Sequence, residues 1–285
     1  MQLLNHDVPW DFNIFLLGDQ HIGARLFDAD GWAATVEMIM SPYEDCTHNI
    51  VVHHGDAIEG ILIDDPRFGI EEVGDMMGRT LDQMAEWKRS IWDIRQKTVC
   101  LLAGNHEFKL QRFGNVGRRM AEEAGIPYGT FSAEITYRRD GKTLFKHFCT
   151  HGRRGLGSIA DDEIRRRANM QLQLKRSLVR KNGTCLLMSR GHSHKIMVTP
   201  PNPELFLSST GEKLAQHYTA PPQEYTNGFI HPNLRWYVNG GSYLKTYGIG
   251  FSGYGERGDY DPVELGFCVA LVRGGKLVNV REEKI

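Results

Sequence analysis

Short runs of consecutive apolar residues alternate along this chain with longer stretches in which apolar residues recur every three or four positions. Bounded apolar runs of about four to eight residues are typical of buried strands, and the wider spacing is typical of helices. The main strand candidates are 12–17, 50–53, 98–103, 144–149 and 184–188. Strands that alternate with helices predict an α/β fold.

Four stretches carry a helical pattern. In the first, Trp32, Val36, Ile39 and Met40 mark one apolar side, and the pair Ser41-Pro42 ends the pattern. The predicted helices span 29–40, 71–96, 116–123 and 159–181.

Two β-hairpins are indicated by glycine-containing turns. Asp140-Gly141 separates 131–138 from 144–150, and Gly274-Gly275 separates 267–272 from 277–280. Because hairpin strands are antiparallel, we expect mixed sheets rather than purely parallel ones.

The segment 195–238 differs from the rest by its proline content and by short predicted strands at 205–208 and 235–238. It is too short for a second domain. We therefore expect a single domain over 1–285, within which 195–238 forms an insertion or a lid.

Composition excludes several classes of protein. The 285 residues are 41% hydrophobic and 24% charged, with a net charge of −1, so no overall field favours nucleic acid or a membrane. The five cysteines are dispersed and form no CxxC pair, which favours a reducing compartment, here the cytoplasm, over a disulfide framework. We find no signal peptide and no apolar run of the ~18 residues that a membrane span needs.

One segment departs from this balance. Residues 153–181 contain nine basic and three acidic side chains, a local net charge of +6. A solvated helix face explains such a run, and so does a patch for polyanionic substrates that includes Arg153, Arg154, Arg165 and Arg166. The sequence leaves both explanations open.

Candidate chemistry follows the strand candidates. Each of the five apolar runs ends beside a glycine and an Asp, Asn or His residue. Because the carboxyl ends of neighbouring strands converge on one edge of an α/β sheet, we expect these side chains to meet. A polar residue that simply begins a loop explains one such case, but it is a poor account of five. The set comprises Asp19, His21, Asp56, Asn105, His106, His151, His192 and His194.

These residue types predict a metal site. Imidazole, carboxylate and amide oxygen without thiolate suit Mn²⁺, Fe or Zn²⁺. There are too many candidate ligands for one tetrahedral zinc, whereas two cations with a shared carboxylate require about this number. Two divalent cations attract an anionic substrate and acidify water, as hydrolysis of a phosphoester requires.

The ordered motifs resemble those of the calcineurin-like metallophosphoesterases. The motifs are Asp19-x-His21, Gly55-Asp56-x-x-Glu59, Gly104-Asn105-His106-Glu107, His151-Gly152 and Gly191-His192-x-His194, and Asn239-Gly-Gly-Ser242 loosely resembles a later turn. The resemblance implies two mixed β-sheets packed face to face and flanked by helices. It also implies hydrolysis by a water molecule that two divalent metal ions, Mn²⁺ first, activate.

The resemblance further implies a role for each residue. Asp19, His21 and His194 would hold one metal, and Asn105, His151 and His192 the other, with Asp56 as the bridge. His106 would be a general acid or charge stabiliser. Glu59 and Glu107 would orient ligands, although plain surface carboxylates are an equal alternative.

Several functions fit this chemistry. We favour a phosphodiesterase or nuclease acting on nucleic acid or nucleotides, because the basic segment follows His151 and the tail is rich in tyrosine. A phosphomonoesterase, including a protein phosphatase, is the alternative, and a scaffold that has lost its metals is a remote one. A metallo-β-lactamase-like hydrolase would need a His-x-His-x-Asp-His run, which is absent. The sequence leaves the oligomeric state open.

Overall fold

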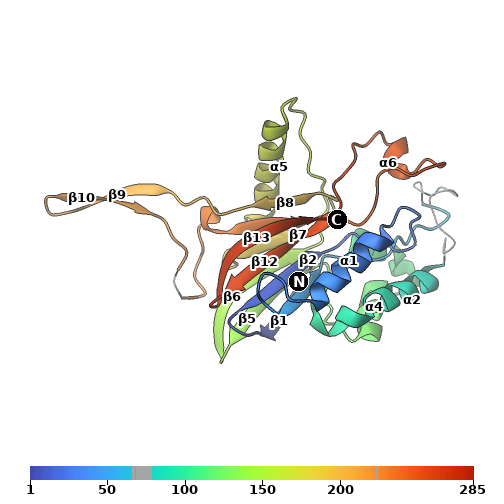
Figure 1. Ribbon diagram of the computed structural model, residues 1–285, viewed down its shortest axis with the longest axis horizontal. Helices are drawn as coiled ribbons and strands as arrows, with labels where there is room; N and C mark the ends of the chain where they lie inside the picture. Colours follow the sequence, from blue (N-terminus) through green and yellow to red (C-terminus); the bar gives the residue numbers. More distant parts are fainter. Residues whose placement is uncertain (66–67, 69–78, 223) are drawn as a thin grey trace.

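Two mixed β-sheets form the centre of the protein, whose computed structural model describes residues 1–65, 68, 79–222 and 224–285 (Figure 1). The five-stranded sheet has the order β13-β12-β2-β3-β4, and the six-stranded sheet the order β1-β5-β6-β7-β11-β8. The first sheet consists of β2 (Phe12–Leu17), β3 (Asn49–His53), β4 (Thr98–Leu101), β12 (Gly266–Arg273) and β13 (Lys276–Lys284). The second consists of β1 (Gln2–Asp7), β5 (Ser132–Arg139), β6 (Lys142–Thr150), β7 (Leu187–Arg190), β8 (Ile196–Thr199) and β11 (Trp236–Gly240).

Helices cover the outer face of each sheet (Figure 1). On the five-stranded sheet lie α1 (Ala29–Met40), α2 (Thr80–Ser90) and α4 (Val116–Ala124), and on the six-stranded sheet lies α5 (Glu163–Leu178). The shorter helices are α3 (Asn105–Lys109), α6 (Tyr254–Arg257) and the 3-10 turns η1 (Trp92–Lys97), η2 (Leu110–Phe113) and η3 (Pro232–Leu234). Among the described residues, no helix combines the length and apolar character needed to cross a membrane.

The alternation of side-chain directions along β2 explains how this strand contributes to two hydrophobic cores. Successive side chains of a strand point to opposite faces of the sheet. Phe12 and Ile14 pack in the core between the sheets with Ile135 of β5, while Phe15 and Leu17 belong to the core beneath the helices. All of β2 is therefore buried, and the predicted α/β fold with two mixed sheets and flanking helices is confirmed.

Both predicted hairpins are confirmed, because β5 pairs antiparallel with β6 and β12 with β13. The first turn needs two residues with positive φ, and Asp140 has φ 50° and Gly141 φ 77°. Asp and Gly adopt this conformation more readily than other residues, which explains why the pair marks a tight turn.

Several elements and one side chain differ from the prediction. The last long helix begins at Glu163 rather than at 159, because Asp162 caps it by accepting a hydrogen bond from the Arg165 backbone amide. Met40, which the spacing placed on the apolar side of the first helix, is 51% exposed. The strand predicted at 184–188 is β7, which spans Leu187–Arg190. Of the helix predicted at 71–96, residues 71–78 lie outside the described part of the chain, and the remainder is α2 followed by η1.

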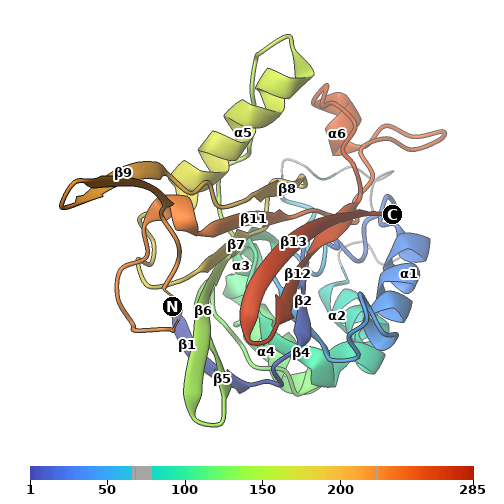
Figure 2. The same cartoon turned by 60° about the vertical axis from the view of Figure 1, so that its left-hand side comes forward.

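The segment 195–238 contributes to the sheet at both of its ends. β8 and β11 pair with each other inside the six-stranded sheet. Between them, β9 (Leu205–Thr210) and β10 (Lys213–Tyr218) form a separate hairpin. This hairpin projects away from the edge at which β2 and β7 end (Figures 1 and 2).

Candidate metal centre

The carboxyl ends of five strands deliver the candidate ligands to one edge of the two sheets. Asp19 and His21 follow β2, Asp56 follows β3, Asn105 and His106 open α3 after β4, His151 follows β6, and His192 and His194 follow β7. These strands are parallel to one another within each sheet, so their ends point the same way. Six of the eight residues form two groups, in each of which one ligand atom per residue lies within 4.8 Å of the others.

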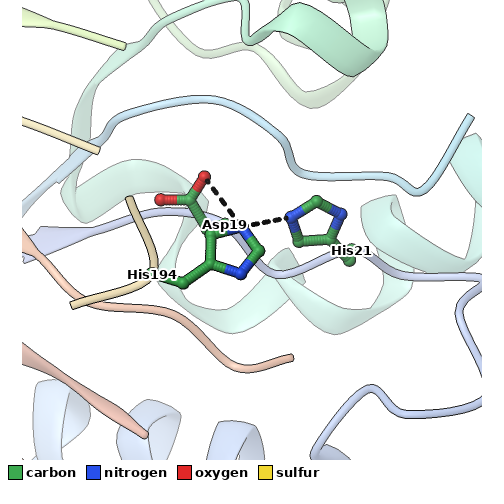
Figure 3. A group of neighbouring side chains, drawn as sticks. All are labelled: Asp19, His21 and His194. Atoms are coloured by element: carbon green, nitrogen blue, oxygen red, sulfur yellow. Dashed lines mark hydrogen bonds and ion pairs between the residues drawn. The ribbon is translucent and has the colours of Figure 1, made fainter. Parts of the chain in front are cut away.

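The first group consists of Asp19, His21 and His194, whose side chains turn toward one another in Figure 3. The Nε2 atoms of His21 and His194 are 3.1 Å apart, and His194 Nε2 lies 3.9 Å from Asp19 Oδ1. Asp19 Oδ1 is buried and has no hydrogen-bond partner. A buried carboxylate oxygen without a partner is costly, and a cation held between it and the two imidazoles would remove that cost.

The second group consists of Asp56, His151 and His192. His151 Nε2 lies 3.2 Å from Asp56 Oδ2 and 2.9 Å from Asn105 Oδ1. The amide oxygen of Asn105 thus lies next to this group. Both groups consist of nitrogen and oxygen ligands, which suit divalent metals of intermediate hardness.

His106 lies between the two groups. Its ring centroid is 4.6 Å from that of His21, and its Nε2 atom is 4.0 Å from Asp56 Oδ2. His106, His21 and Glu59 also satisfy the distance criterion for a metal group. Because His21 Nδ1 and His106 Nδ1 are both hydrogen-bonded to Glu59, we interpret this third group as a set of orienting bonds instead.

Three of the imidazole rings form a hydrogen bond through Nδ1, and this orientation directs their Nε2 atoms toward the centre of the site. His21 Nδ1 bonds to Glu59 Oε2 at 2.7 Å, His151 Nδ1 donates to the His54 carbonyl at 2.8 Å, and His106 Nδ1 donates to the Glu59 carbonyl. Metal-binding histidines are usually oriented by such bonds. Glu59 is only 8% exposed, so the surface-carboxylate alternative is wrong for it.

Glu107 is also buried, but its carboxylate binds backbone amides rather than an imidazole ring. Its carboxylate accepts hydrogen bonds from the amides of Gly104 (2.7 Å), Asp56 (3.1 Å) and Ala57 (2.7 Å). The loops after β3 and β4 therefore approach very closely, and a Cβ atom on Gly104 would lie 2.0 Å from Asp56 Oδ1. Only glycine fits at this position.

Backbone strain is concentrated at the candidate ligands. Five of the eight have φ in the left-handed region: Asp19 (50°), His21 (56°), Asp56 (48°), His192 (73°) and His194 (52°). Non-glycine residues adopt this region at a cost of about 1–3 kcal/mol each, and such residues often cluster at functional sites. The fold therefore holds these side chains in position even though their backbone conformations are unfavourable.

Burial and charge shift the pKa values of the ligands in opposite directions. Burial raises the pKa of Asp19 to about 7. Burial by itself would lower the pKa values of His21 and His151, but the carboxylates of Glu59 and Asp56 raise them to about 9. Protons on these rings thus balance the buried carboxylates in the metal-free protein, and a cation would replace them.

We expect metal affinity to increase with pH. Protons compete with the cation at His21, His151 and Asp19, so binding should tighten as the pH rises, most steeply below about pH 7, where all three groups are protonated, and level off above about pH 9, where they are deprotonated. Calorimetric titration with Mn²⁺ in buffers of different ionisation enthalpy measures both the affinity and the protons released. Affinity that does not change over this range would contradict the assignment of these groups as ligands.

Replacement of Glu59 should weaken metal binding without unfolding the protein. Glu59→Gln keeps an oxygen acceptor for His21 but removes the negative charge, so we expect about a 10-fold loss of Mn²⁺ affinity. Glu86→Gln, whose exposed carboxylate pairs with Arg89, is the matched control. Equal affinity in both variants would show that Glu59 does not act on the metal ligands.

A buried polar network that no sequence pattern indicated lies beneath the centre. His54 Nδ1 donates to the Leu17 carbonyl (2.9 Å), so its Nε2 accepts from Ser189 Oγ (2.6 Å). Ser189 then accepts from His147 Nε2 (2.6 Å), and His147 Nδ1 accepts from Tyr137 (3.2 Å). Burial lowers the pKa of His54 to about 3, which keeps its ring neutral. The network ties both sheets together and holds the carbonyl that orients His151.

Three of the four predicted basic residues are exposed, and the fourth is engaged within the protein. Arg153, Arg154 and Arg165 are exposed. Arg166 donates to the Ala160 carbonyl at 3.1 Å and pairs with Glu163. Arg166 therefore has a structural role that the charge count did not reveal.

Comparison of the chain with protein-family models gives no match, and comparison with curated proteins gives none either. The assignment of chemistry therefore depends on the geometry described above.

Proposed function

We propose that this protein is a metal-dependent phosphoesterase of the calcineurin-like type, with two divalent cations at the edge formed by β2, β3, β4, β6 and β7. The observation that carries the proposal is the pair of adjacent nitrogen and oxygen groups, Asp19/His21/His194 and Asp56/His151/His192. Asn105 completes the second group through Oδ1. Mn²⁺ is the first candidate, and Fe or Zn²⁺ also suit these ligands.

Bound cations would acidify water and neutralise the charge of the phosphate. The chain itself supplies a proton donor at a defined position. His106 is fixed by two bonds, from its backbone amide to Asp56 Oδ1 (2.9 Å) and from Nδ1 to the Glu59 carbonyl. Nε2 is thereby directed to the region between the groups, where it can pass a proton to a leaving oxygen.

A diester of nucleic acid or a nucleotide is our first candidate substrate, because exposed Arg153 and Arg154 follow directly on His151 and Gly152. Arginine side chains contact successive phosphates of a polyanion. A phosphomonoesterase is the alternative, since a small phosphate needs only the metals and His106. The metal-free scaffold stays a remote alternative, because both ligand groups are intact.

Three assays test the proposal. With Mn²⁺ we expect hydrolysis of bis-p-nitrophenyl phosphate and of labelled single-stranded DNA, and loss of both activities with EDTA. Turnover of p-nitrophenyl phosphate alone would favour the monoesterase. The proposal of a phosphoesterase fails if purified, Mn²⁺-loaded protein hydrolyses none of the three.

Neutralisation of Arg153, Arg154 and Arg165 to alanine should weaken nucleic-acid binding. Three lost phosphate contacts should flatten the slope of log affinity against log salt by about 2 for single-stranded DNA. The control replaces Lys97, Lys142 and Lys276, which lie at the amino ends of β4, β6 and β13, at the opposite edge. A salt slope that matches wild type in the arginine variant would assign the basic segment to a solvated surface.

A further inference from the structure

A cavity of about 250 Å³ lies beside the second metal group. Three aromatic rings line it, those of Phe108, Tyr128 and Phe131. The small residues Ala103 and Gly117 also line it, and a Cβ atom at position 117 would lie 3.4 Å from the Tyr128 ring.

Direct contacts connect this cavity to the metal ligands. The ring of Phe131 lies edge-on to His151 with centroids 5.6 Å apart, and it also contacts Phe108 at 6.3 Å. The Phe131 carbonyl accepts the backbone amide of His151 at 3.2 Å. Phe108 follows Asn105 by three positions in α3, so both side chains lie on the same side of that helix. The cavity is therefore one side chain away from the second group.

The other lining groups are polar and well placed for hydrogen bonds. Asn115 Oδ1 accepts from the Arg118 amide (3.0 Å) and from Tyr128 (3.2 Å), bonds that do not use its Nδ2 donors. Gln111 adds a second amide, and the Arg118 guanidinium lies 5.3 Å from the centroid of the Tyr128 ring. Aromatic faces combined with amide donors and acceptors are the groups that bind nucleobases.

Size and charge narrow the choice of ligand. A volume of about 250 Å³ is below the ~300–1,000 Å³ of sites for drug-sized ligands, so it suits one ring system. The carboxylate of Glu107, the acidic residue in the lining, is engaged by backbone amides. A phenyl group from a protein substrate would fill the cavity but form no hydrogen bond with the Asn115 Nδ2 or Gln111 amide groups.

We propose that this cavity is a subsite for a nucleobase of the substrate, adjacent to the phosphoester at the metal centre. The inference rests on the proposed phosphoesterase function and specifies its substrate class as nucleotidyl esters. Phe108, which is 55% exposed, would stack on the base, and Asn115 and Gln111 would bond to its edge.

Two matched substrates test this subsite. The p-nitrophenyl ester of thymidine 5′-monophosphate and methyl p-nitrophenyl phosphate share a leaving group and differ in the nucleoside. We expect wild type to favour the nucleotide ester in kcat/KM by about 10-fold or more, the typical contribution of one stacked base. Phe108→Ala should reduce that ratio about 10-fold through KM, and Phe108→Trp should restore it. Phe113→Ala, which removes a 65% exposed ring from η2, is the control.

Each outcome assigns the failure to one of the two proposals. Hydrolysis of both esters with a ratio near one, or a ratio unchanged in Phe108→Ala, overturns the subsite and leaves the phosphoesterase intact. If neither ester is hydrolysed, calorimetry with deoxyadenosine monophosphate and ribose 5-phosphate decides separately. Tighter binding of the nucleotide that is lost in Phe108→Ala supports the subsite, and equal binding overturns it. Preference for phenyl phosphate over the nucleotide also overturns it, in favour of an aromatic side chain.

Discussion

Asp56→Asn should reduce turnover of a phosphodiester by at least about 10³-fold, since cation-based charge stabilisation contributes several kcal/mol. The substitution keeps the size of the side chain and the Oδ1 acceptor for the His106 amide. It removes the charge that faces His151 Nε2 at 3.2 Å. Burial alone would raise the pKa of Asp56, but the charges of His151 and His106 hold it well below its usual range, so the native group is a carboxylate.

Metal content separates this effect from misfolding. We expect Asp56→Asn to retain fewer than two Mn²⁺ ions per chain after gel filtration, measured by elemental analysis, with an unchanged circular dichroism spectrum. Asp64→Asn is the control, because its side chain is 63% exposed and pairs with Arg112. Two tightly bound ions in the Asp56 variant would refute its role as the bridge.

His106→Ala is expected to lower kcat by about 10²–10⁴-fold while KM and metal content stay near wild-type values. The reason is the position of the ring. Nδ1 is held by the Glu59 carbonyl, and Nε2 faces the region between the two groups, 4.0 Å from Asp56 Oδ2. Loss of a general acid should also be smaller for a substrate with a good leaving group.

The leaving-group dependence is therefore the informative measurement for His106. The rate ratio between wild type and variant should be small for a p-nitrophenyl ester and large for an alkyl ester or DNA. His48→Ala, an exposed histidine without a role in the site, is the control. If metal content falls in parallel with kcat, His106 is a ligand, and the third group with His21 and Glu59 must be reconsidered.

The ends of the strands could be predicted from the sequence because each apolar run stops at a polar residue. This pattern locates Asp19, Asp56 and His192 without knowledge of the sheet order, since parallel strands end at a common edge. The hairpins were predictable for an equally local reason, the positive φ values that Asp140 and Gly141 accept.

Other features depend on contacts between distant parts of the chain. β1 and β8 lie at the two edges of the six-stranded sheet, and β1 has no clear apolar run because most of its side chains are exposed. Ser189 is an ordinary polar residue in the sequence, and its role arises only because His54 and His147 meet it from different strands. The structural bonds of Arg166 likewise involve folded backbone that composition does not describe.

The division of the candidate ligands into two groups could be recognised only from the structure. Sequence spacing suggested a shared site, but the 3.1 Å approach of His21 Nε2 to His194 Nε2 and the unpartnered Asp19 Oδ1 depend on tertiary packing across many residues. These two observations make a cation the simplest means of satisfying the buried atoms.

Anomalous diffraction from a crystal soaked in Mn²⁺ tests the central claim most directly. We predict two peaks about 3.5–4 Å apart, the spacing of catalytic metal pairs. One should be bound by Asp19, His21 and His194, the other by Asn105, His151 and His192, with Asp56 between them. A single peak, or none at these side chains in protein shown to be folded, would contradict the account.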